Sequence, residues 1–304
     1  MKPFFVFSGQ GAQAVGMGKD LAASSAAAAK IFETADAELG YSLSSIIFEG
    51  PEEKLTQTRY CQVAIYTMSC AALEAFKEKF PGITPIGCAG LSLGEYGALY
   101  AAGAFDFVTG LKLLAKRAEL MDAACTATNG GMASILNGDL AVIREVCAEC
   151  GIDVANFNSP AQIVISGEKE KVSAACAMLK EKGIRKAIEL NVAGAFHSRL
   201  MADAGEKLKA VLAETDIALP AVPVYHNFTA APAADVAVLK INLASQVAGS
   251  VRWHECVQAM AAAGGDTMIE FGPGNVLTKL CSRAIPEIAT FNVNSAAALD
   301  ALTF

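Results

Sequence analysis

A single serine, Ser92, stands between two glycines in the stretch Gly90-Leu91-Ser92-Leu93-Gly94. The pattern is G-x-S-x-G, which in enzymes places a nucleophilic serine on a sharp turn between a strand and a helix. An apolar, strand-like run precedes this turn and a helix-like stretch follows it. The main-chain N–H of Leu93 would then lie at a helix start, where it can donate to an oxyanion. We therefore predict that Ser92 is a nucleophile, against the alternative of an ordinary glycine-framed turn.

A serine nucleophile needs a base, and the chain offers only three histidines, His197, His226 and His254. His197 stands where a predicted strand gives way to a predicted helix, in the stretch NVAGAFHSRLM. Proteins of alternating strands and helices place cleft-facing side chains at such junctions. Any of the three could instead be a structural histidine, but position favours His197 as the base.

Arg117 is notable for its place on a predicted helix, Val108–Cys125. At about 100° per residue, Lys112, Lys116 and Glu119 share one polar sector. Arg117 falls on the opposite side, among apolar residues that include Met121. A buried, unpaired charge is very costly, so this arginine needs an anion. The anion is either a carboxylate of the protein or the carboxylate of a substrate, which a guanidinium binds with two parallel hydrogen bonds.

The glycine-rich turn FSGQGAQ near the N-terminus admits two interpretations. Gly9, Gly11 and Ala14 fit the dinucleotide-binding pattern G-x-G-x-x-A after a strand. That pattern requires an acidic residue about 20 positions later at the end of a second strand, and here the region reads as helix. We therefore reject nucleotide binding. The same turn can instead offer the main-chain N–H of Gln10 to an oxyanion.

The elements that position these residues alternate between strands and helices, which indicates a mostly parallel sheet. The expected strands and helices of the first part are Lys2–Phe7, Lys19–Glu38, Cys61–Glu78, Ile83–Ala89, Leu93–Ala102 and Val108–Cys125. After the middle of the chain, a helix at Ser198–Glu214 and strands in VPVYHN and TMIEFGPG follow.

Between about Ala127 and Glu189 the order of elements is β-α-β-β-α-β, that of a ferredoxin-like unit. We therefore predict an α/β fold in which a ferredoxin-like α+β subdomain, residues 127–191, is inserted into a large domain. The large domain comprises residues 1–126 and 192–304.

Composition narrows the class of protein. The chain has 304 residues, a formal net charge of −7 and no long basic run, which argues against nucleic acid as a partner. No apolar stretch is long enough for a membrane helix or built like a signal peptide, so we expect a cytoplasmic protein with no membrane partner. Nine scattered cysteines suggest reduced thiols. Cys147 and Cys150 form one C-x-x-C pair without a second pair or nearby histidines, so we expect no metal site.

The chain resembles the malonyl-CoA:acyl-carrier-protein transacylase family, which is related to the acyltransferase domains of polyketide synthases. The resemblance rests on an ordered set of motifs that spans nearly the whole chain: FSGQGAQ, GLSLGEY, RAELM, FNSPAQIVISG, AFHSRLM, ASQVAGSVRW and EFGPGNVLTKL. It implies a hydrolase-like α/β domain with an inserted ferredoxin-like subdomain, in agreement with the organisation above.

The resemblance also implies roles for particular residues. Ser92 would be the nucleophile, His197 the base and Arg117 the partner of the malonyl carboxylate. The main-chain amides of Gln10 and Leu93 would form the oxyanion hole. The remaining residues would bind substrate or orient the histidine: the backbone carbonyl of Gln246 would hold the histidine, and Asn158, Phe196 and Met121 would line the same cleft.

The implied reaction is a ping-pong transfer of malonyl from malonyl-CoA to Ser92 and then to the thiol of acyl carrier protein. It needs no cofactor, and a monomer is the expected state. Many members carry histidine where this chain has Leu91. The GAFH sequence before His197 resembles that of malonyl-selecting acyltransferases, in which Phe196 would occupy the space of a 2-methyl group. The alternative is a serine thioesterase or esterase, for which a buried Arg117 has little use.

Overall fold

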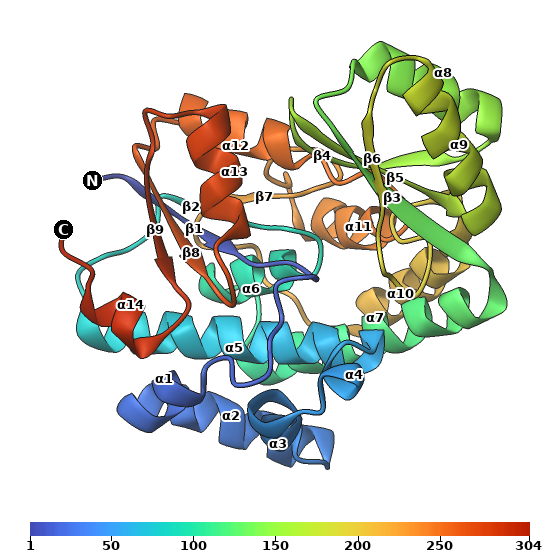
Figure 1. The fold of residues 1–304 in the computed structure, drawn as a ribbon. Coiled ribbons are helices and arrows are strands. Elements are labelled where there is room, and N and C mark those ends of the chain that lie inside the picture. The colour runs from blue at the N-terminus through green and yellow to red at the C-terminus, as the bar shows by residue number, and fades with distance from the viewer.

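The computed structural model describes residues 1–304 and contains two sheets, seen at the left and the upper right of Figure 1. In the larger sheet all five strands are parallel, in the order β7-β2-β1-β8-β9. Its strands are β1 (Pro3–Phe7), β2 (Gly87–Gly90), β7 (Val224–Tyr225), β8 (Thr267–Phe271) and β9 (Ala289–Val293). The predicted α/β class with a parallel sheet is confirmed.

Helices cover both faces of this sheet, and the central strand β1 shows why. Every residue of β1 is buried. Its successive side chains point to opposite faces, as in any strand. Phe5 and Phe7 join the main core, which also contains α5 (Thr58–Lys79), whereas Phe4 and Val6 join a second core with α12 (Trp253–Ala262) and α13 (Val276–Ala284). A strand buried on both faces reads as a continuous apolar run, as PFFVF does.

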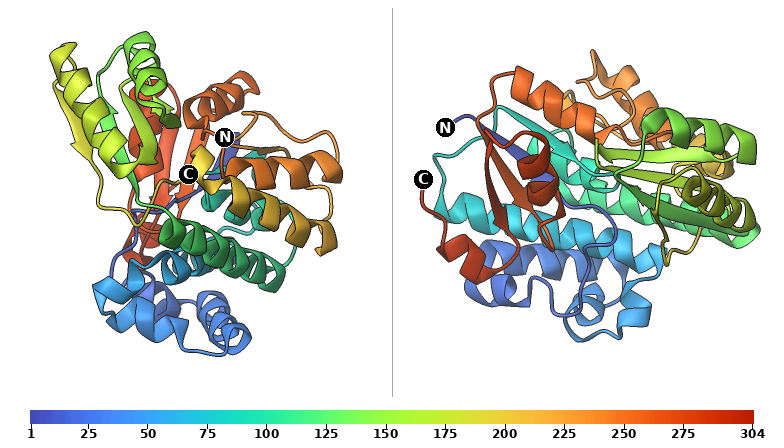
Figure 2. Two further views of the ribbon diagram at one scale, coloured as in Figure 1. Left: turned by 90° about the vertical axis from the view of Figure 1, so that its right-hand side faces the viewer. Right: turned by 45° about the horizontal axis from the view of Figure 1, so that its top comes forward.

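The other helices of the large domain pack around this sheet or extend its α5 face (Figures 1 and 2). They are α1 (Lys19–Ser24), α2 (Ala26–Leu39), α3 (Leu43–Glu49), α4 (Glu52–Leu55), α6 (Gly94–Ala101), α7 (Phe107–Ala127), η1 (Arg199–Met201), α10 (Ala202–Glu214), α11 (Val236–Gln246) and α14 (Ala296–Asp300). None of these helices, nor any other in the chain, combines the length and apolar character that crossing a bilayer requires.

The smaller sheet is antiparallel, with the order β4-β5-β3-β6. It consists of β3 (Gly130–Leu136), β4 (Asp153–Ser159), β5 (Gln162–Glu168) and β6 (Lys186–Glu189), with α8 (Leu140–Cys150) and α9 (Lys169–Glu181) packed on it. Order and connectivity are those of a ferredoxin-like unit. It has a core of its own, made mostly of Ile, Val and Ala side chains. Domain boundaries at residues 127 and 191 remain a proposal that this separate core supports.

The loop before α12 joins the two sheets. The main-chain N–H of Val251 donates to Ala155 O, and the N–H of Phe157 donates to Val251 O, both at 2.8 Å. The side chains of Arg199 and Asp153 add an ion pair across the same junction. The smaller sheet is therefore fixed directly beside the segments that carry residues 197 and 246.

Two expected elements differ from the structure. The single helix predicted over Lys19–Glu38 is two helices, because the side chain of Ser25 accepts a hydrogen bond from Ala28 N and so caps a new helix. The strand predicted over Ile83–Ala89 is regular only from Gly87, where pairing with β1 begins.

Candidate active site

Ser92 occupies the turn between β2 and α6 and has a positive φ of 54°. Both flanking positions require glycine, because other main-chain atoms lie too close to them for a Cβ atom. A Cβ atom on Gly90 would lie 2.0 Å from the carbonyl of Gly94, and one on Gly94 would lie 2.2 Å from Phe7 O. No side chain fits in that space, so the G-x-S-x-G spacing follows from the packing of the turn against itself and against β1.

His197 lies beside Ser92 although 105 residues separate them in the chain. Its Nε2 is 2.8 Å from Ser92 Oγ, and its Nδ1 is 2.8 Å from the main-chain oxygen of Gln246. A carbonyl oxygen only accepts, so Nδ1 carries the proton and Nε2 presents a lone pair to the serine hydroxyl. A backbone carbonyl thus takes the place that an aspartate has in Ser-His-Asp sites.

Arg117 is 1% exposed and lies against Ser92 and Gln246. One terminal nitrogen donates to Ser92 Oγ and to Gln246 Oε1, each at 3.0 Å, and the other donates to Gln62 Oε1 at 2.6 Å. Its Nε is buried without a partner, and it takes part in no ion pair. A buried cation held only by neutral oxygens and by the face of the Tyr96 ring, 5.9 Å away, keeps most of its attraction for an anion.

The electrostatics of the site keep the histidine neutral. Burial and the neighbouring Arg117 charge lower the pKa of His197 to about 4. Burial also lowers the pKa of Arg117, while Tyr96 and Glu95 act in the opposite direction. At neutral pH the imidazole is therefore unprotonated and able to accept the proton of the serine hydroxyl.

The two predicted oxyanion donors lie on either side of this turn. Leu93 is the residue before α6, and Gln10 lies in the loop after β1. Neither main-chain N–H donates a hydrogen bond within the protein, whereas the neighbouring N–H of Ser92 is taken by Asn227. The Gln10 loop lies against the turn, because a Cβ on Gly9 would be 2.7 Å from Leu91 O. Both N–H groups are therefore available to a ligand.

The other predicted residues are less closely connected. Phe196 precedes His197 and is 7% exposed, as part of the main core. Met121 is buried, and its sulfur is 3.5 Å from Gln62 Nε2, so it packs behind the Arg117 partner. Asn158 lies on β4 with Oδ1 buried and without a partner, and no hydrogen bond joins it to the serine or the histidine.

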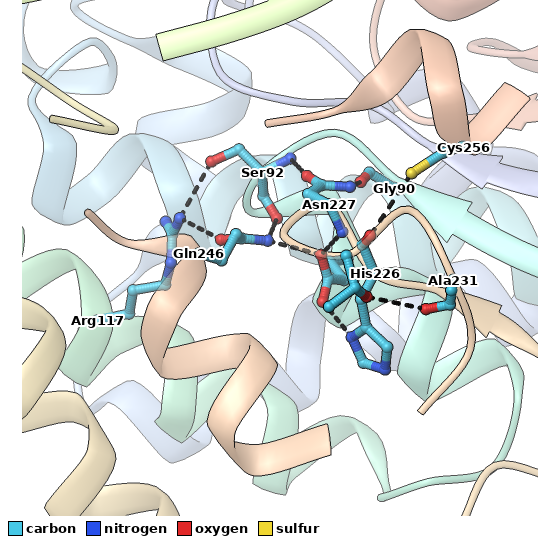
Figure 3. A network of polar contacts seen from close by, with 10 residues as sticks. Gly90, Ser92, Arg117, His226, Asn227, Ala231, Gln246 and Cys256 are labelled. Atoms are coloured by element: carbon cyan, nitrogen blue, oxygen red, sulfur yellow. Dashed lines mark hydrogen bonds and ion pairs between the residues drawn. The ribbon is translucent and has the colours of Figure 1, made fainter. Parts of the chain in front are cut away.

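Three polar residues of the site, Gln62, Glu95 and Asn227, were not predicted from the sequence. Figure 3 shows Asn227 between Gly90 and Ser92, and Arg117 reaching toward Ser92 and Gln246. Two of them have a local signal, a polar group in an apolar element: Gln62 lies in the largely buried α5, and Glu95 is the one charged residue of α6. Asn227 lies in the segment after β7 and has no such signal.

Comparison with known proteins shows which family the chain resembles over nearly its whole length. The family model described as acyl transferase domain matches residues 4–300. The malonyl CoA-acyl carrier protein transacylase of Bacillus subtilis (strain 168) is 44% identical over 295 residues, 95% of this chain and 92% of the relative. A solved acyl-carrier-protein S-malonyltransferase from Burkholderia pseudomallei superposes with a TM-score of 0.95 at 40% identity, covering 99% of this chain and 98% of the other. A malonyl-transacylase solved in complex with a type II PKS acyl-carrier protein gives a TM-score of 0.95 at 36% identity, with the same shares covered.

Proposed function

Because this chain belongs to the acyl transferase family, and within it to the malonyl CoA-acyl carrier protein transacylases, we propose that it moves a malonyl group from malonyl-CoA to the thiol of an acyl carrier protein. The observation that carries the proposal is Arg117. A buried guanidinium with no carboxylate partner, 3.0 Å from the hydroxyl of a serine nucleophile, suits a substrate that carries both a reactive acyl carbon and a free carboxylate.

The first half of the reaction loads the enzyme. Ser92 Oγ attacks the thioester carbon as its proton passes to His197 Nε2. The tetrahedral oxyanion accepts hydrogen bonds from the main-chain N–H groups of Gln10 and Leu93. The C–S bond then breaks, and the departing CoA thiolate takes the proton from His197. The product is a malonyl ester on Ser92, with the free carboxylate on Arg117.

The second half reverses these steps with a different thiol. The pantetheine thiol of the carrier protein gives its proton to His197 and attacks the ester carbon. The C–O bond to Ser92 breaks, and the serine regains its proton from the histidine. No atom is oxidised or reduced and no step needs a Lewis acid, so the proposed reaction uses no metal or redox cofactor.

Phe196 and Met121 belong in this proposal as apolar walls near the malonyl group, and Asn158 as a further polar group of the cleft. All the residues of the proposed site come from one chain, which fits a monomer. The nine cysteines are all unpaired, which fits a reducing cytoplasm. The pathway served is that of fatty-acid or polyketide synthesis.

Intact-mass measurement after mixing with malonyl-CoA tests the proposal. We expect an adduct of one malonyl group that disappears in Ser92→Ala and is discharged by added carrier protein. Ser250→Ala, a change at another hydroxyl that bonds to Val154 O, is the matched control and keeps the adduct. Release of free malonate without an adduct would instead indicate a thioesterase.

A further inference from the structure

A buried carboxylate, Glu95, lies behind the proposed site without touching the reacting serine hydroxyl. It is in the first turn of α6, three residues after Ser92, and is 0% exposed. No lysine or arginine pairs with it, and the one titratable side chain that bonds to it is the imidazole of His226. A buried carboxylate destabilises the fold unless its oxygens accept hydrogen bonds. The donors that bind Glu95 therefore indicate its role.

Three donors converge on its two oxygens. Oε1 accepts from His226 Nδ1 at 2.6 Å. Oε2 accepts from Gln246 Nε2 at 2.7 Å and from the main-chain N–H of Asn227 at 2.9 Å. These donors come from α11 and from the segment after β7, so one side chain of α6 joins two separate parts of the chain to the nucleophile turn.

The bond to Gln246 fixes which way its amide faces. A carboxylate only accepts, so the NH₂ end must face Glu95 and the oxygen must face Arg117, which donates to it at 3.0 Å. A reversed amide would place two acceptors together at Glu95 and two donors together at Arg117. The NH₂ end also donates to Ser92 O at 3.0 Å, and the backbone oxygen of Gln246 holds His197.

The bond to Asn227 supports the turn itself. The side chain of Asn227 donates to Gly90 O at 2.7 Å and accepts from Ser92 N at 2.6 Å, so it bridges the turn from one side to the other (Figure 3). This bridge spans the residue whose backbone has positive φ. With its main-chain N–H held by Glu95, the Asn227 amide is fixed in place.

We propose that Glu95 is a positioning residue for malonyl transfer: it orients the Gln246 amide and anchors Asn227, and through them it places Arg117, His197 and the Ser92 turn. This inference rests on the proposed function. His226 is the third donor of the same cluster. Its Nδ1 bonds to Glu95 and its Nε2 is buried without a partner. The His226 side chain therefore makes no hydrogen bond to Ser92 or His197.

Two substitutions at Glu95 remove its hydrogen-bond acceptors in part or completely. Glu95→Gln keeps one oxygen for Gln246 and Asn227, and its NH₂ group can donate to His226 Nδ1 once that ring changes tautomer. Glu95→Ala removes every acceptor. For malonyl loading of Ser92 we expect kcat/KM to fall about 10-fold in Glu95→Gln and about 100-fold in Glu95→Ala, because about an ångström of displacement in a reacting group costs on this order. Glu145→Gln, at an ion-paired surface glutamate of α8, is the matched control and leaves the rate unchanged.

A double-mutant cycle with Gln246→Ala tests whether Glu95 acts through Gln246. Residues that share one network are not additive. The double variant Glu95→Gln/Gln246→Ala should therefore load malonyl within about 3-fold of Gln246→Ala alone. The ratio of malonyl to acetyl loading should also fall in Glu95→Ala, because the Gln246 amide then loses its acceptor and Arg117 loses the fixed oxygen to which it donates. A general loss of folded protein would lower both rates equally and leave that ratio unchanged.

The outcomes separate the two proposals. If the wild-type protein takes up no malonyl group, the proposed function fails. If the wild type loads normally, then wild-type rates in Glu95→Gln and Glu95→Ala, fully additive effects in the cycle, or an unchanged malonyl-to-acetyl ratio would overturn the positioning role. Thermal melting of each variant accompanies the kinetics, and should Glu95→Ala fail to fold, Glu95→Gln and the cycle decide.

Discussion

Replacement of Arg117 by alanine should abolish the preference for malonyl over acetyl that the proposed role of this residue implies. The guanidinium has two terminal nitrogens that are held only by neutral oxygens and can turn to a ligand carboxylate. Each hydrogen bond between charged partners contributes about 1.5–3 kcal/mol, and leaving a buried charge unpaired costs about 3–5 kcal/mol. We therefore expect kcat/KM for malonyl-CoA to fall by roughly 10²- to 10³-fold, since 1.4 kcal/mol is tenfold.

The acetyl group has no carboxylate, so its transfer loses no such contact. Acetyl loading should rise by about 10-fold or less, because the variant no longer places an apolar group beside an unpaired guanidinium. Both rates are read from the growth of the acyl-enzyme mass in single turnovers without carrier protein. Acetyl-CoA is thus an internal control for damage to the nucleophile, to which Arg117 also donates.

Two further variants sharpen this experiment. Arg117→Lys keeps the charge but loses the planar pair of donors, and should fall between the wild type and alanine. Glu119→Ala, an exposed change on the same helix that breaks only the pair with Lys116, should change neither rate. A malonyl-to-acetyl ratio in Arg117→Ala equal to that of the wild type would refute the carboxylate-binding role.

The remaining predictions concern pH, the turn and the smaller domain. Because the pKa of His197 is lowered to about 4, kcat/KM for malonyl loading should stay level as pH falls through 6.5 and decline only near 4, and Arg117→Ala should move the decline to higher pH; a wild-type decline centred at 6.5 would contradict this. The same buried neutral histidine should also make stability depend on pH. As pH is lowered from 6.5 to 4, the free energy of unfolding should decrease by about 1.4 kcal/mol per pH unit, because the unfolded chain binds a proton that the folded chain does not. Gly94→Ala should destabilise the protein by about 3 kcal/mol in urea titration, because its Cβ would lie 2.2 Å from Phe7 O, whereas Gly82→Ala, with open space around it, should be neutral; equal effects would refute the close-packing argument. Leu179→Ala should cost about 3 kcal/mol and accelerate amide hydrogen exchange in β3–β6 while leaving β1, β2 and β8 protected; uniform acceleration would show that the smaller core does not open separately.

The residues that the sequence analysis identified without the family resemblance are those with a local signal. Ser92 is marked by the glycines that its turn requires, and Arg117 by a charge on the apolar side of a helix. His197 was selected from three histidines by its place between two elements. The ferredoxin-like unit was visible because each of its strands and helices has a regular pattern of its own.

The residues that the sequence analysis missed are defined by distant contacts. Asn227 acts on a turn 135 residues earlier, and Glu95 meets Gln246 across 151 residues. An asparagine or glutamine in isolation does not show whether its amide meets water or a buried partner. The break at Ser25 was missed because alanine-rich sequence on both sides favours helix, and only the cap decides where one helix ends.

The backbone at Ser92 and at His197 has a further consequence, for the evolutionary history of such chains. Both residues have positive φ, 54° and 56°, which costs a side chain other than glycine about 1 kcal/mol. At these two positions the fold would gain stability by giving up the groups proposed to do the chemistry. A descendant released from selection for acyl transfer should therefore drift toward glycine or asparagine there while its core stays intact. The residues at positions 92 and 197 would then distinguish catalytically active members of a lineage from inactive ones better than overall sequence similarity does.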